Sequence, residues 1–407
     1  MLMSAPSVPS PANLAPGRAL RRRLLPLRVA TFLQGVGFWV PVEKLFETQI
    51  GFDAAAIGLV SAAYAAVVPL LEVPTGVLAD RWSRRGVLAV ASAALTVSAL
   101  LGGLAHDVPS YLASALALGV FFASNSGTLD AAVYDTLLEE TGSSERYERE
   151  MGRFRVLDSL ALVSSALVGG WLAEAVSLRA TYFLTIPFAL VSVLACLRFR
   201  EPVLHRAQRP VPLRRHLALS YRALVGQRRL IPVVALGVLA ALLLQLILEF
   251  GPLWLVALTV PAVLYGPYWA GLTGSLGLGG LLAGRLRLDR PRVAGVLAGL
   301  LALSGVALAV GTTAAVAIAA QVVLAVIVVA AGIHVSRLLH DAVPSSVRAG
   351  VGSAVSTLSW SAFVPFALAI GFLSTRHGVP ASGWLIAGTT VLAGLLLVAV
   401  AIDQKRA

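Results

Sequence analysis

The sequence predicts an all-α integral membrane protein with twelve transmembrane helices in two six-helix bundles. Three observations support this fold class. Of the 407 residues, 58% are hydrophobic and 13% are charged, whereas an ordinary soluble domain has about 25% charged residues. Apolar segments of roughly 20 residues, the length that crosses the hydrocarbon core, recur along nearly the whole chain. One long polar connection divides these segments into two sets of six.

Glycine, proline and charge clusters mark the ends of the twelve predicted spans. The spans cover residues 27–47, 55–77, 86–104, 110–137, 155–174, 179–197, 231–255, 262–285, 293–311, 313–338, 348–373 and 383–402. Residues 1–25 are expected to form a disordered cytoplasmic tail, because their Pro-, Ala- and Ser-rich start lacks the apolar core of a signal peptide. The two bundles are then 26–197 and 231–403, joined by a cytoplasmic loop, 198–230, and followed by a short cytoplasmic tail, 404–407.

The basic residues indicate the orientation of the chain. With the N-terminus inside, 29 of the 32 Lys and Arg residues lie on the cytoplasmic side, and only Lys44, Arg179 and Arg376 lie outside. This bias predicts that both termini are cytoplasmic in a bacterial plasma membrane. The positive charges sit in short loops and form no continuous basic face, which argues against nucleic-acid binding. The single cysteine, Cys196, forms no metal-binding spacing and is expected in the core.

Short segments recur at an offset close to half the chain length. Residues 76–81 (GVLADR) match residues 280–285 (GLLAGR) at an offset of 204, and Ser143-Ser144-x-Arg146 matches Ser345-Ser346-x-Arg348 at an offset of 202. Together they indicate a duplicated six-helix unit. Internal repeats of this kind are typical of transporters that bind substrate between the repeats.

The segment Gly76–Gly86, GVLADRWSRRG, resembles the signature of the major facilitator superfamily, Gly-x-Leu-Ala-Asp-Arg-x-Gly-Arg-Arg, with Ser83 in place of the second glycine. Residues 72–76 and 126–135 also resemble a bacterial branch of exporters within it. The resemblance covers about residues 25–403. It implies two pseudo-symmetric bundles, secondary transport of a small molecule by alternating access, no cofactor, and a monomer.

The same resemblance implies a gate in the loop between helices two and three. The residues concerned are Gly76, Asp80, Arg81, Arg84 and Arg85. Asp80 would face the N-terminus of helix eleven when the cytoplasmic side is closed, where the helix dipole stabilises a carboxylate. The chain departs from proton-driven drug antiporters in two places: residues 111–138 contain no Lys or Arg, and helix five carries Ser165-Ala-Leu-Val-Gly-Gly170 where they carry Gly-Pro-x-x-Gly-Gly.

Polar side chains inside the predicted spans are costly in lipid, so they mark candidate functional positions. The candidates singled out here fall on helices one, four, seven and ten, which line the cavity in the superfamily; helices three, six, nine and twelve contain no ionisable residue between their ends. The candidates are Gln34 and Glu43; Asn125, Asp130 and Asp135; Gln245 and Glu249; Gln321, His334 and Arg337.

Aromatic residues dominate the expected midplane. Phe38 and Trp39 lie there on helix one, and Phe121 and Phe122 lie there with Asn125 on helix four. Such a cavity favours a hydrophobic or amphipathic substrate. Gln34, Phe38, Trp39, Phe122, Asn125, Gln245, Gln321, His334 and Arg337 are therefore the candidate cavity-lining residues.

Carboxylates screened from water can load a proton near neutral pH. Asp130 is the first candidate for coupling, followed by Glu249 and Glu43; the alternative for each is an ion pair that stabilises one conformation. His334 and Arg337 could pair with Asp130 or Asp135 as an inner gate. Glu72 and Asp158 look structural.

The leading functional hypothesis is an ion-coupled exporter of hydrophobic small molecules, with the proton as the expected coupling ion. The alternatives are an uptake porter for a nutrient or metabolite and, outside the porters, a lipid scramblase or a membrane enzyme. An enzyme needs clustered catalytic groups, and the sequence offers no His/Asp or metal cluster. The glycines of helix eight favour close packing, and no ATP-binding loop is present.

Overall fold

The computed structural model describes residues 15–125, 128–142, 147–202, 230–283, 285–342 and 348–406. Within these ranges every regular element is a helix, and ten helical segments are long and apolar enough to cross a membrane. The chain is therefore a multi-pass membrane protein. The other two predicted spans, 27–47 and 262–285, correspond to a broken first helix and to a glycine-rich helix of lower hydropathy, and neither is among those ten.

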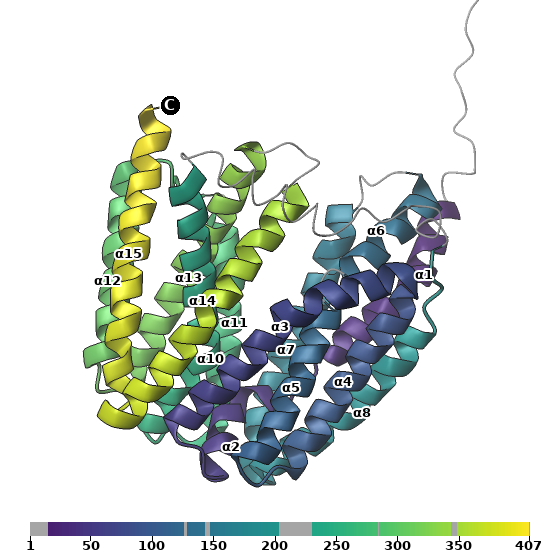
Figure 1. Ribbon diagram of the computed structural model, residues 1–407, viewed down its shortest axis with the longest axis horizontal. Coiled ribbons are helices and arrows are strands. Elements are labelled where there is room, and N and C mark those ends of the chain that lie inside the picture. Colours follow the sequence, from purple (N-terminus) through teal and green to yellow (C-terminus); the bar gives the residue numbers. More distant parts are fainter. Residues whose placement is uncertain are drawn as a thin grey trace, which may run out of the picture.

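The helices form two groups that stand side by side, with the C-terminus at one end of the molecule (Figure 1). The first group contains α1 (Ala15–Gln34), η2 (Val40–Val42), α2 (Glu43–Gln49), α3 (Ala54–Arg81), α4 (Arg84–Leu104), α5 (Val108–Asn125), α6 (Thr128–Thr141), α7 (Tyr147–Ala175) and α8 (Leu178–Leu197). The second contains α10 (Ile231–Ala257), η5 (Ala262–Leu264), α11 (Tyr265–Ala283), α12 (Pro291–Val310), α13 (Ala314–Ala342), α14 (Arg348–His377) and α15 (Val379–Arg406).

Short polar caps begin several of the helices. The Asp53 carboxylate accepts the Ala56 N–H at 2.7 Å at the start of α3, and the Ser83 hydroxyl accepts the Gly86 N–H at 3.0 Å at the start of α4. Each cap satisfies one backbone donor that the first turn leaves free. Because α3 continues to Arg81, residues 76–81 are helical, and the expected loop is reduced to Trp82 and Ser83.

The structure corrects two further expectations near the N-terminus. Residues 15–25 are helical, with Leu20 and Leu24 buried, whereas a disordered tail was predicted over 1–25; residues 1–14 lie outside the described ranges. The first span is not a continuous helix over 27–47. It stops at Gln34, runs through an irregular segment, 35–39, and resumes as η2 and α2.

Many large apolar side chains are exposed, as lipid contact requires. On α12 and α15, Val296, Leu303 and Leu395 are each about two-thirds exposed. Exposed aliphatic side chains also cover outward positions of α4 and α8, including Val97 and Leu190. These are the third, sixth, ninth and twelfth predicted spans, for which the sequence predicts lipid-facing positions.

The two groups of helices approach each other most closely through glycines. A Cβ added at Gly58 on α3 would lie 2.5 Å from the Ala367 carbonyl of α14, and one at Gly371 on α14 would lie 2.7 Å from the Ala54 carbonyl. On the other side, a Cβ at Gly266 on α11 would lie 2.6 Å from the Ala166 carbonyl of α7. The absence of side chains therefore lets the halves meet backbone to backbone.

Candidate functional site

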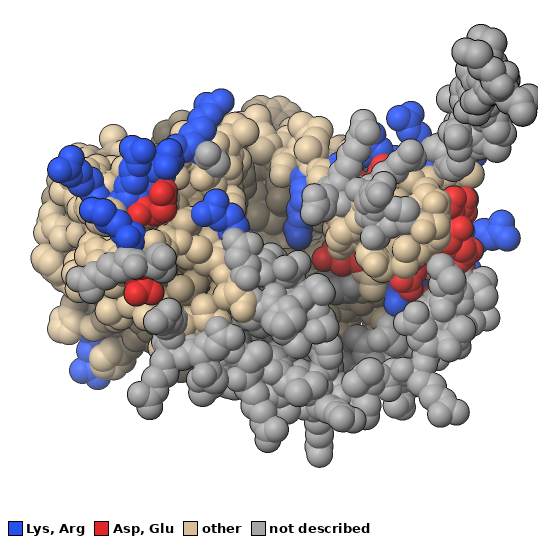
Figure 2. Space-filling model, turned by 90° about the horizontal axis from the view of Figure 1, so that it is seen from above, with Lys and Arg blue, Asp and Glu red and all other residues tan. Residues whose placement is uncertain are grey.

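A cavity of about 740 Å³ lies between the two groups of helices. Its lining comes from the α1–α2 region and from α3, α5, α6 and α7 of the first half, and from α10, α11 and α14 of the second, with single residues of α4 and α8. Figure 2, which looks onto the face that carries the C-terminus, shows this face hollowed between the halves, with Lys and Arg side chains gathered on it. The cavity therefore opens toward the end of the molecule at which the C-terminus lies.

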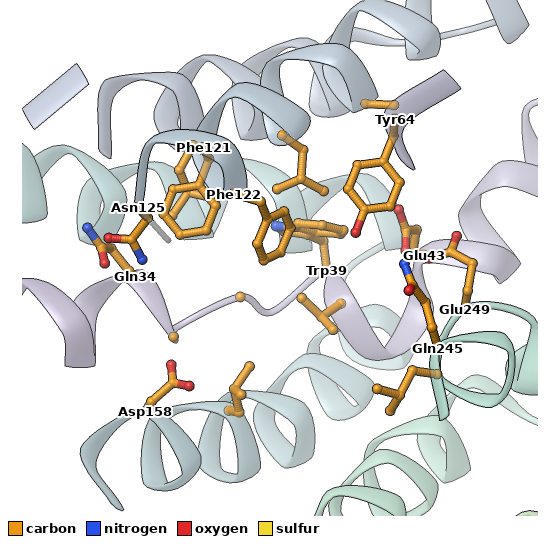
Figure 3. Close-up of a pocket in the computed structure, with 18 of the residues that line it drawn as sticks. Gln34, Trp39, Glu43, Tyr64, Phe121, Phe122, Asn125, Asp158, Gln245 and Glu249 are labelled. Carbon is orange, nitrogen blue, oxygen red and sulfur yellow. The ribbon is translucent and has the colours of Figure 1, made fainter. Parts of the chain in front are cut away.

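The cavity combines an aromatic middle with polar groups at its two ends (Figure 3). Gln34 and Asn125 lie together at one end, and Gln245, Glu43 and Glu249 lie together at the other, with Trp39 and Phe122 between them. Tyr64 contacts Phe122, with 6.0 Å between the ring centroids, and Trp360 of the second half, with 5.7 Å. The middle of the cavity can therefore contact an apolar or cationic solute through ring faces.

The break in the first span shapes one wall of the cavity. Thr31, Gln34 and Gly35 line the cavity, so α1 ends at its wall. The irregular segment packs against α7: a Cβ added at Gly169 would lie 2.1 Å from the Phe38 carbonyl, and the Ser165 hydroxyl donates to the Gly35 carbonyl at 3.3 Å. Irregular backbone at membrane depth is tolerated where it borders a cavity, and a helix C-terminus carries partial negative charge.

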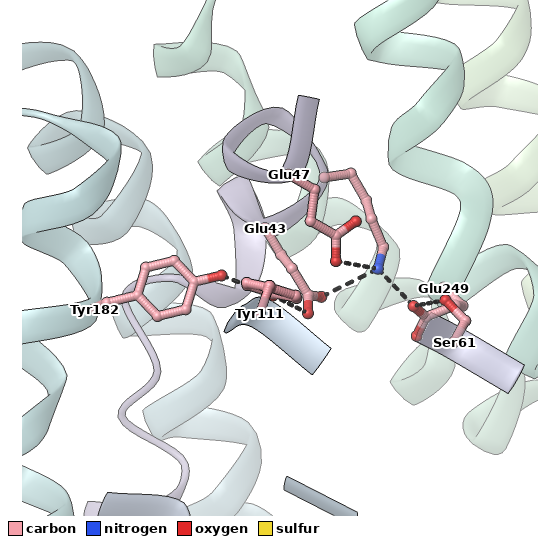
Figure 4. A network of polar contacts seen from close by, with 7 residues as sticks. Glu43, Glu47, Ser61, Tyr111, Tyr182 and Glu249 are labelled. Carbon is pink, nitrogen blue, oxygen red and sulfur yellow. Dashed lines mark hydrogen bonds and ion pairs between the residues drawn. The ribbon is translucent and has the colours of Figure 1, made fainter. Parts of the chain in front are cut away.

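A cluster of charged side chains closes the opposite end of the cavity (Figure 4). The Lys44 ammonium lies 2.6 Å from Glu249 Oε1, 3.2 Å from Glu47 Oε1 and 3.6 Å from Glu43 Oε2. Lys44 and Glu47 are 3% and 1% exposed, so their charges are screened little by water. We refer to Glu43, Lys44, Glu47 and Glu249 as the charge cluster.

Three hydroxyl groups extend the charge cluster into the surrounding helices. The Ser61 hydroxyl of α3 donates to Glu249 Oε1 at 2.8 Å, and the Tyr111 hydroxyl of α5 donates to Glu43 Oε1 at 2.9 Å. Tyr111 and Tyr182 of α8 share a hydrogen bond of 2.9 Å. Glu249 is the member that comes from the second half of the chain, so the Lys44–Glu249 ion pair joins the two halves.

Three buried polar atoms of cavity-lining residues have no hydrogen-bond partner within the described part of the chain. They are Glu47 Oε2 and the indole nitrogens of Trp39 and Trp269. An unpaired buried carboxylate oxygen is costly, and the charge cluster places three carboxyl groups around one ammonium. A proton on a carboxyl group would reduce both costs.

The cavity collects most of the residues singled out from the sequence. Its lining includes Gln34, Trp39, Glu43, Phe122, Asn125, Asp130, Gln245 and Glu249. Asp130 lies in the first turn of α6, is half-buried, and is away from the charge cluster. Its carboxyl group interacts electrostatically with the Arg155 guanidinium. Asp158, which was expected to be structural, also lines the cavity.

Four predicted lining residues lie elsewhere. The Phe38 ring packs edge-on against Phe188 at a centroid distance of 5.6 Å, and Gln321 is fully buried and accepts a hydrogen bond of 2.5 Å from the Tyr268 hydroxyl. His334 lies 3.1 Å from Gln404 of α15, and Arg337 is exposed. In this structure, in which that end of the cavity is open, His334 contacts Gln404 and Arg337 is exposed, so neither pairs with Asp130 or Asp135, and their pairing as an inner gate stays a prediction for the closed state.

The signature residues are only partly described. Arg84 is buried, pairs with Asp135 of α6, and donates to the Ala131 carbonyl at 2.8 Å, while Arg85 is exposed. Arg84 therefore ties α4 to α6. Gly76 lies within α3, but the side chains of Glu72, Asp80 and Arg81 lie outside the described part of the structure, as does any contact they make with α14.

Sequence reasoning missed several residues of the charge cluster and its partners: Lys44, Glu47, Ser61, Tyr111 and Tyr182. Lys44 was used only as an orientation marker, and Glu47 fell on the last residue of a predicted span. Their signal was the acidic and basic run Glu43-Lys44-x-x-Glu47 at the end of an apolar segment. The described residues contain no group of His, Cys, Asp or Glu that could hold a metal ion.

The fold and the solute-sized cavity between its halves define a membrane transporter. Residues 27–365 match the family model of the Major Facilitator Superfamily, and the chain belongs to this superfamily. An uncharacterized MFS-type transporter of Methanocaldococcus jannaschii is 20% identical over 199 residues, and Multidrug resistance protein 1 of Bacillus subtilis is 24% identical over 169 residues. These matches cover 48% and 41% of this chain, and 50% and 42% of the relatives' own lengths.

Solved structures share the fold at low sequence identity. The crystal structure of the nucleoside transporter NupG superposes with a TM-score of 0.74 at 16% identity, covering 92% of this chain and 98% of that one. A bacterial homolog to the human lysosomal transporter Spinster, in an inward-facing and unoccupied conformation, gives a TM-score of 0.69 at 15% identity, covering 95% of each chain. At this identity the likeness establishes the fold alone.

Proposed function

We propose that this chain is a proton-coupled exporter that moves a small hydrophobic or amphipathic molecule out of a bacterial cell by alternating access. The observation that carries the proposal is the aromatic cavity of about 740 Å³ between the halves, closed at one end by a buried charge cluster that joins them. Breaking that cluster and closing the other end would expose the same cavity to the opposite side.

The proposed membrane arrangement has twelve spans in two pseudo-symmetric bundles of six. Ten of these spans are the segments of spanning length and hydropathy, and the broken α1–α2 segment and α11 supply the other two. The distribution of Lys and Arg, 29 against 3, supports cytoplasmic termini in the plasma membrane. In that orientation the cavity opens to the cytoplasm, and the charge cluster closes the outer side.

The Lys44–Glu249 ion pair would act as the outer gate. Separating a buried pair leaves each charge uncompensated, at a cost of roughly 3–5 kcal/mol unless water or a proton replaces the partner. The Asp80 side of the molecule would supply the inner gate, with the carboxylate of Asp80 and the arginines of the signature facing the start of α14 when the cytoplasmic end closes.

The charge cluster would also carry the coupling proton. Three carboxyl groups around one ammonium leave excess negative charge in a buried place, and Glu47 Oε2 has no partner among the described residues. Protonation of Glu47 removes a charge and supplies a donor. Opening the outer side would expose this proton site to external water. Asp130, which the sequence ranks first for this role, lies away from the charge cluster that joins the two halves, so opening of that end would not change its surroundings directly.

The experiment is transport in proteoliposomes of a permanently charged lipophilic dye, whose distribution does not itself respond to pH. With the lumen at pH 6 and the outside at pH 8, protons leaving through an antiporter drive dye into the lumen. An uptake porter coupled by symport accumulates solute under the opposite gradient. A scramblase moves labelled lipid between the two leaflets without needing either gradient.

Two variants locate the coupling site. Glu47→Gln should still carry dye down its own gradient but lose accumulation driven by the pH gradient, whereas Asp130→Asn should keep that accumulation. The reverse result would assign the coupling proton to Asp130. No dye flux by the wild type under either gradient would end both the exporter and the uptake proposals for this class of solute.

Export is favoured over uptake by the aromatic lining and by the partial match to Multidrug resistance protein 1 of Bacillus subtilis. The structural neighbours include a D-xylose-proton symporter, so the fold is also compatible with proton-coupled uptake. The sign of the gradient that drives accumulation decides between them.

A further inference from the structure

A second cavity, which we call the side chamber, opens beside the central one. It has a volume of about 380 Å³ and lies among α10, α13 and α14 of the second half. Its described walls are aliphatic side chains and the glycines Gly237 and Gly332, with Ser336 as the one hydroxyl. A chamber of this composition gives water few partners and suits hydrocarbon.

The side chamber adjoins the central cavity. Ala241 and Leu244 of α10 line both, and Gln245, the next residue along α10, lines the central cavity at its polar end. A single molecule can therefore place an apolar part in the side chamber and a polar part in the central cavity. Two hydrocarbon tails of membrane-lipid length would exceed the volume of the side chamber.

The charge of the central cavity selects the sign of the polar part. Its described lining holds five carboxyl groups and two cationic groups: Glu43, Glu47, Asp130, Asp158 and Glu249 against Lys44 and Arg155. The wall at which α1 ends adds the partial negative charge of a helix C-terminus.

Aromatic rings supply the rest of the head-group site. The Tyr64 ring contacts both the Phe122 ring and the Trp360 ring in the cavity wall, with centroid distances of 6.0 Å and 5.7 Å. Ring faces attract an organic cation that has been removed from water. The carboxylates, the helix end and the rings therefore favour the same charge.

We propose that the substrate is an organic cation with one unbranched hydrocarbon tail, whose head occupies the aromatic, acidic central cavity and whose tail occupies the side chamber. The inference rests on the proposed transport function, because it names the substrate class of the same cavity. It adds a reason for proton exchange: the cationic head and the bound proton neutralise the same excess of carboxylates, so each disfavours the other.

The test measures equilibrium binding, so its outcome is separate from that of the gradient-driven flux assay. Alkyltrimethylammonium ions with 4, 6, 8 and 10 carbons, kept below micelle-forming concentrations, are titrated into the protein in lipid nanodiscs. Burial of each methylene is worth roughly a fourfold gain in affinity. We expect affinity to rise by about that factor per carbon until the side chamber is filled, and then to level off.

Gly332→Leu fills the side chamber. A Cβ at Gly332 meets no atom within 4 Å, so the larger side chain enters open space. It should weaken binding of the 10-carbon ion by tenfold or more and leave the 4-carbon ion unchanged. Gly299→Leu is the matched control, because Gly299 also has open space around its Cβ but lies exposed on α12. Ser336→Leu narrows the same chamber from another position if Gly332→Leu fails to fold.

Alkyl sulfates of equal length test the head group. We expect them to bind at least tenfold more weakly than the ammonium ions, with the gap reduced in Asp158→Asn. Equal chain-length dependence in the Gly332→Leu, Ser336→Leu and Gly299→Leu variants would overturn the tail site and leave the chamber to bilayer lipid. Equal affinity for sulfates and ammonium ions would overturn the cationic head.

Discussion

Among the described residues of the cavity wall, Lys44 makes the most ion pairs at the closed end. Its ammonium lies within 3.6 Å of three carboxylates, from two turns of its own short helix and from α10. The group is almost fully buried, so its desolvation is offset only by these partners. Glu47, one turn away, has one carboxylate oxygen without a partner among the described residues. A simple ion pair would leave no such oxygen, whereas a site that binds a proton has one available.

Removal of the Lys44 cation tests this residue-level balance. Lys44→Met keeps the length of the side chain but leaves three carboxyl groups facing one another, which should destabilise the closed outer end by roughly 3–5 kcal/mol. We expect a lower thermal unfolding midpoint in nanodiscs at neutral pH. The double variant Lys44→Met/Glu249→Gln removes one charge of each sign across the halves and should recover part of the loss. An unchanged midpoint in Lys44→Met would contradict a stabilising cluster.

The helices are positioned by glycine contacts and by the break in the first span. The first span stops at Gln34 and resumes at Val40, and this geometry sets Trp39 and the charge cluster on the cavity wall. At the same end, α3 and α14 pack backbone to backbone around Gly58 and Gly371. The closed end is therefore held by both charge and close packing.

A larger side chain at the α3–α14 contact should open that end. In Gly371→Leu the new side chain meets the α3 backbone, and overpacking of this kind costs about 1–3 kcal/mol. A shift of 1 kcal/mol changes the ratio of two conformations by about fivefold. Gly388→Leu on α15 is the control, because a Cβ there meets no atom within 4 Å.

The readout is labelling of Val60→Cys by a membrane-impermeant maleimide in intact cells, with Cys196 replaced by alanine. Val60 lines the cavity and is buried beneath the closed end. Gly371→Leu should raise the outside labelling rate at least fivefold, and Gly388→Leu should not. Equal rates in the two variants would show that the glycine contact does not control access from this side.

At the scale of the whole molecule, the sequence was most informative where the bilayer constrains composition. Runs of apolar residues predicted the spanning helices because lipid requires both their length and their apolar surface. The break at residues 35–39 was not predicted, because hydropathy depends on side-chain type and carries no information about backbone conformation. Gly35, Gly37 and Pro41 within one span were its available signal.

Side-chain partners were harder to predict than spans. His334 and Gln321 were assigned to the cavity because they lie on the expected helix, yet α13 turns them toward α15 and α11. Glu47 and Tyr182 were not singled out from the sequence, because the charge cluster and its hydroxyl partners bring together residues of five separate helices. The rotation of each helix about its axis is set by its neighbours, which a single sequence does not specify.

The central claim is that the Lys44–Glu249 pair couples the two ends of the cavity. Spin labels at Asp107 and Thr312 report the closed end from the two halves, and labels at Arg198 and Arg290 report the open end; all four residues are exposed. Pulsed electron spin resonance would give both distance distributions for Cys196→Ala protein in nanodiscs, with and without Glu249→Gln. The account predicts that Glu249→Gln lengthens the Asp107–Thr312 distance and shortens the Arg198–Arg290 distance. Two distances that stay unchanged, or that move in the same direction, would contradict it.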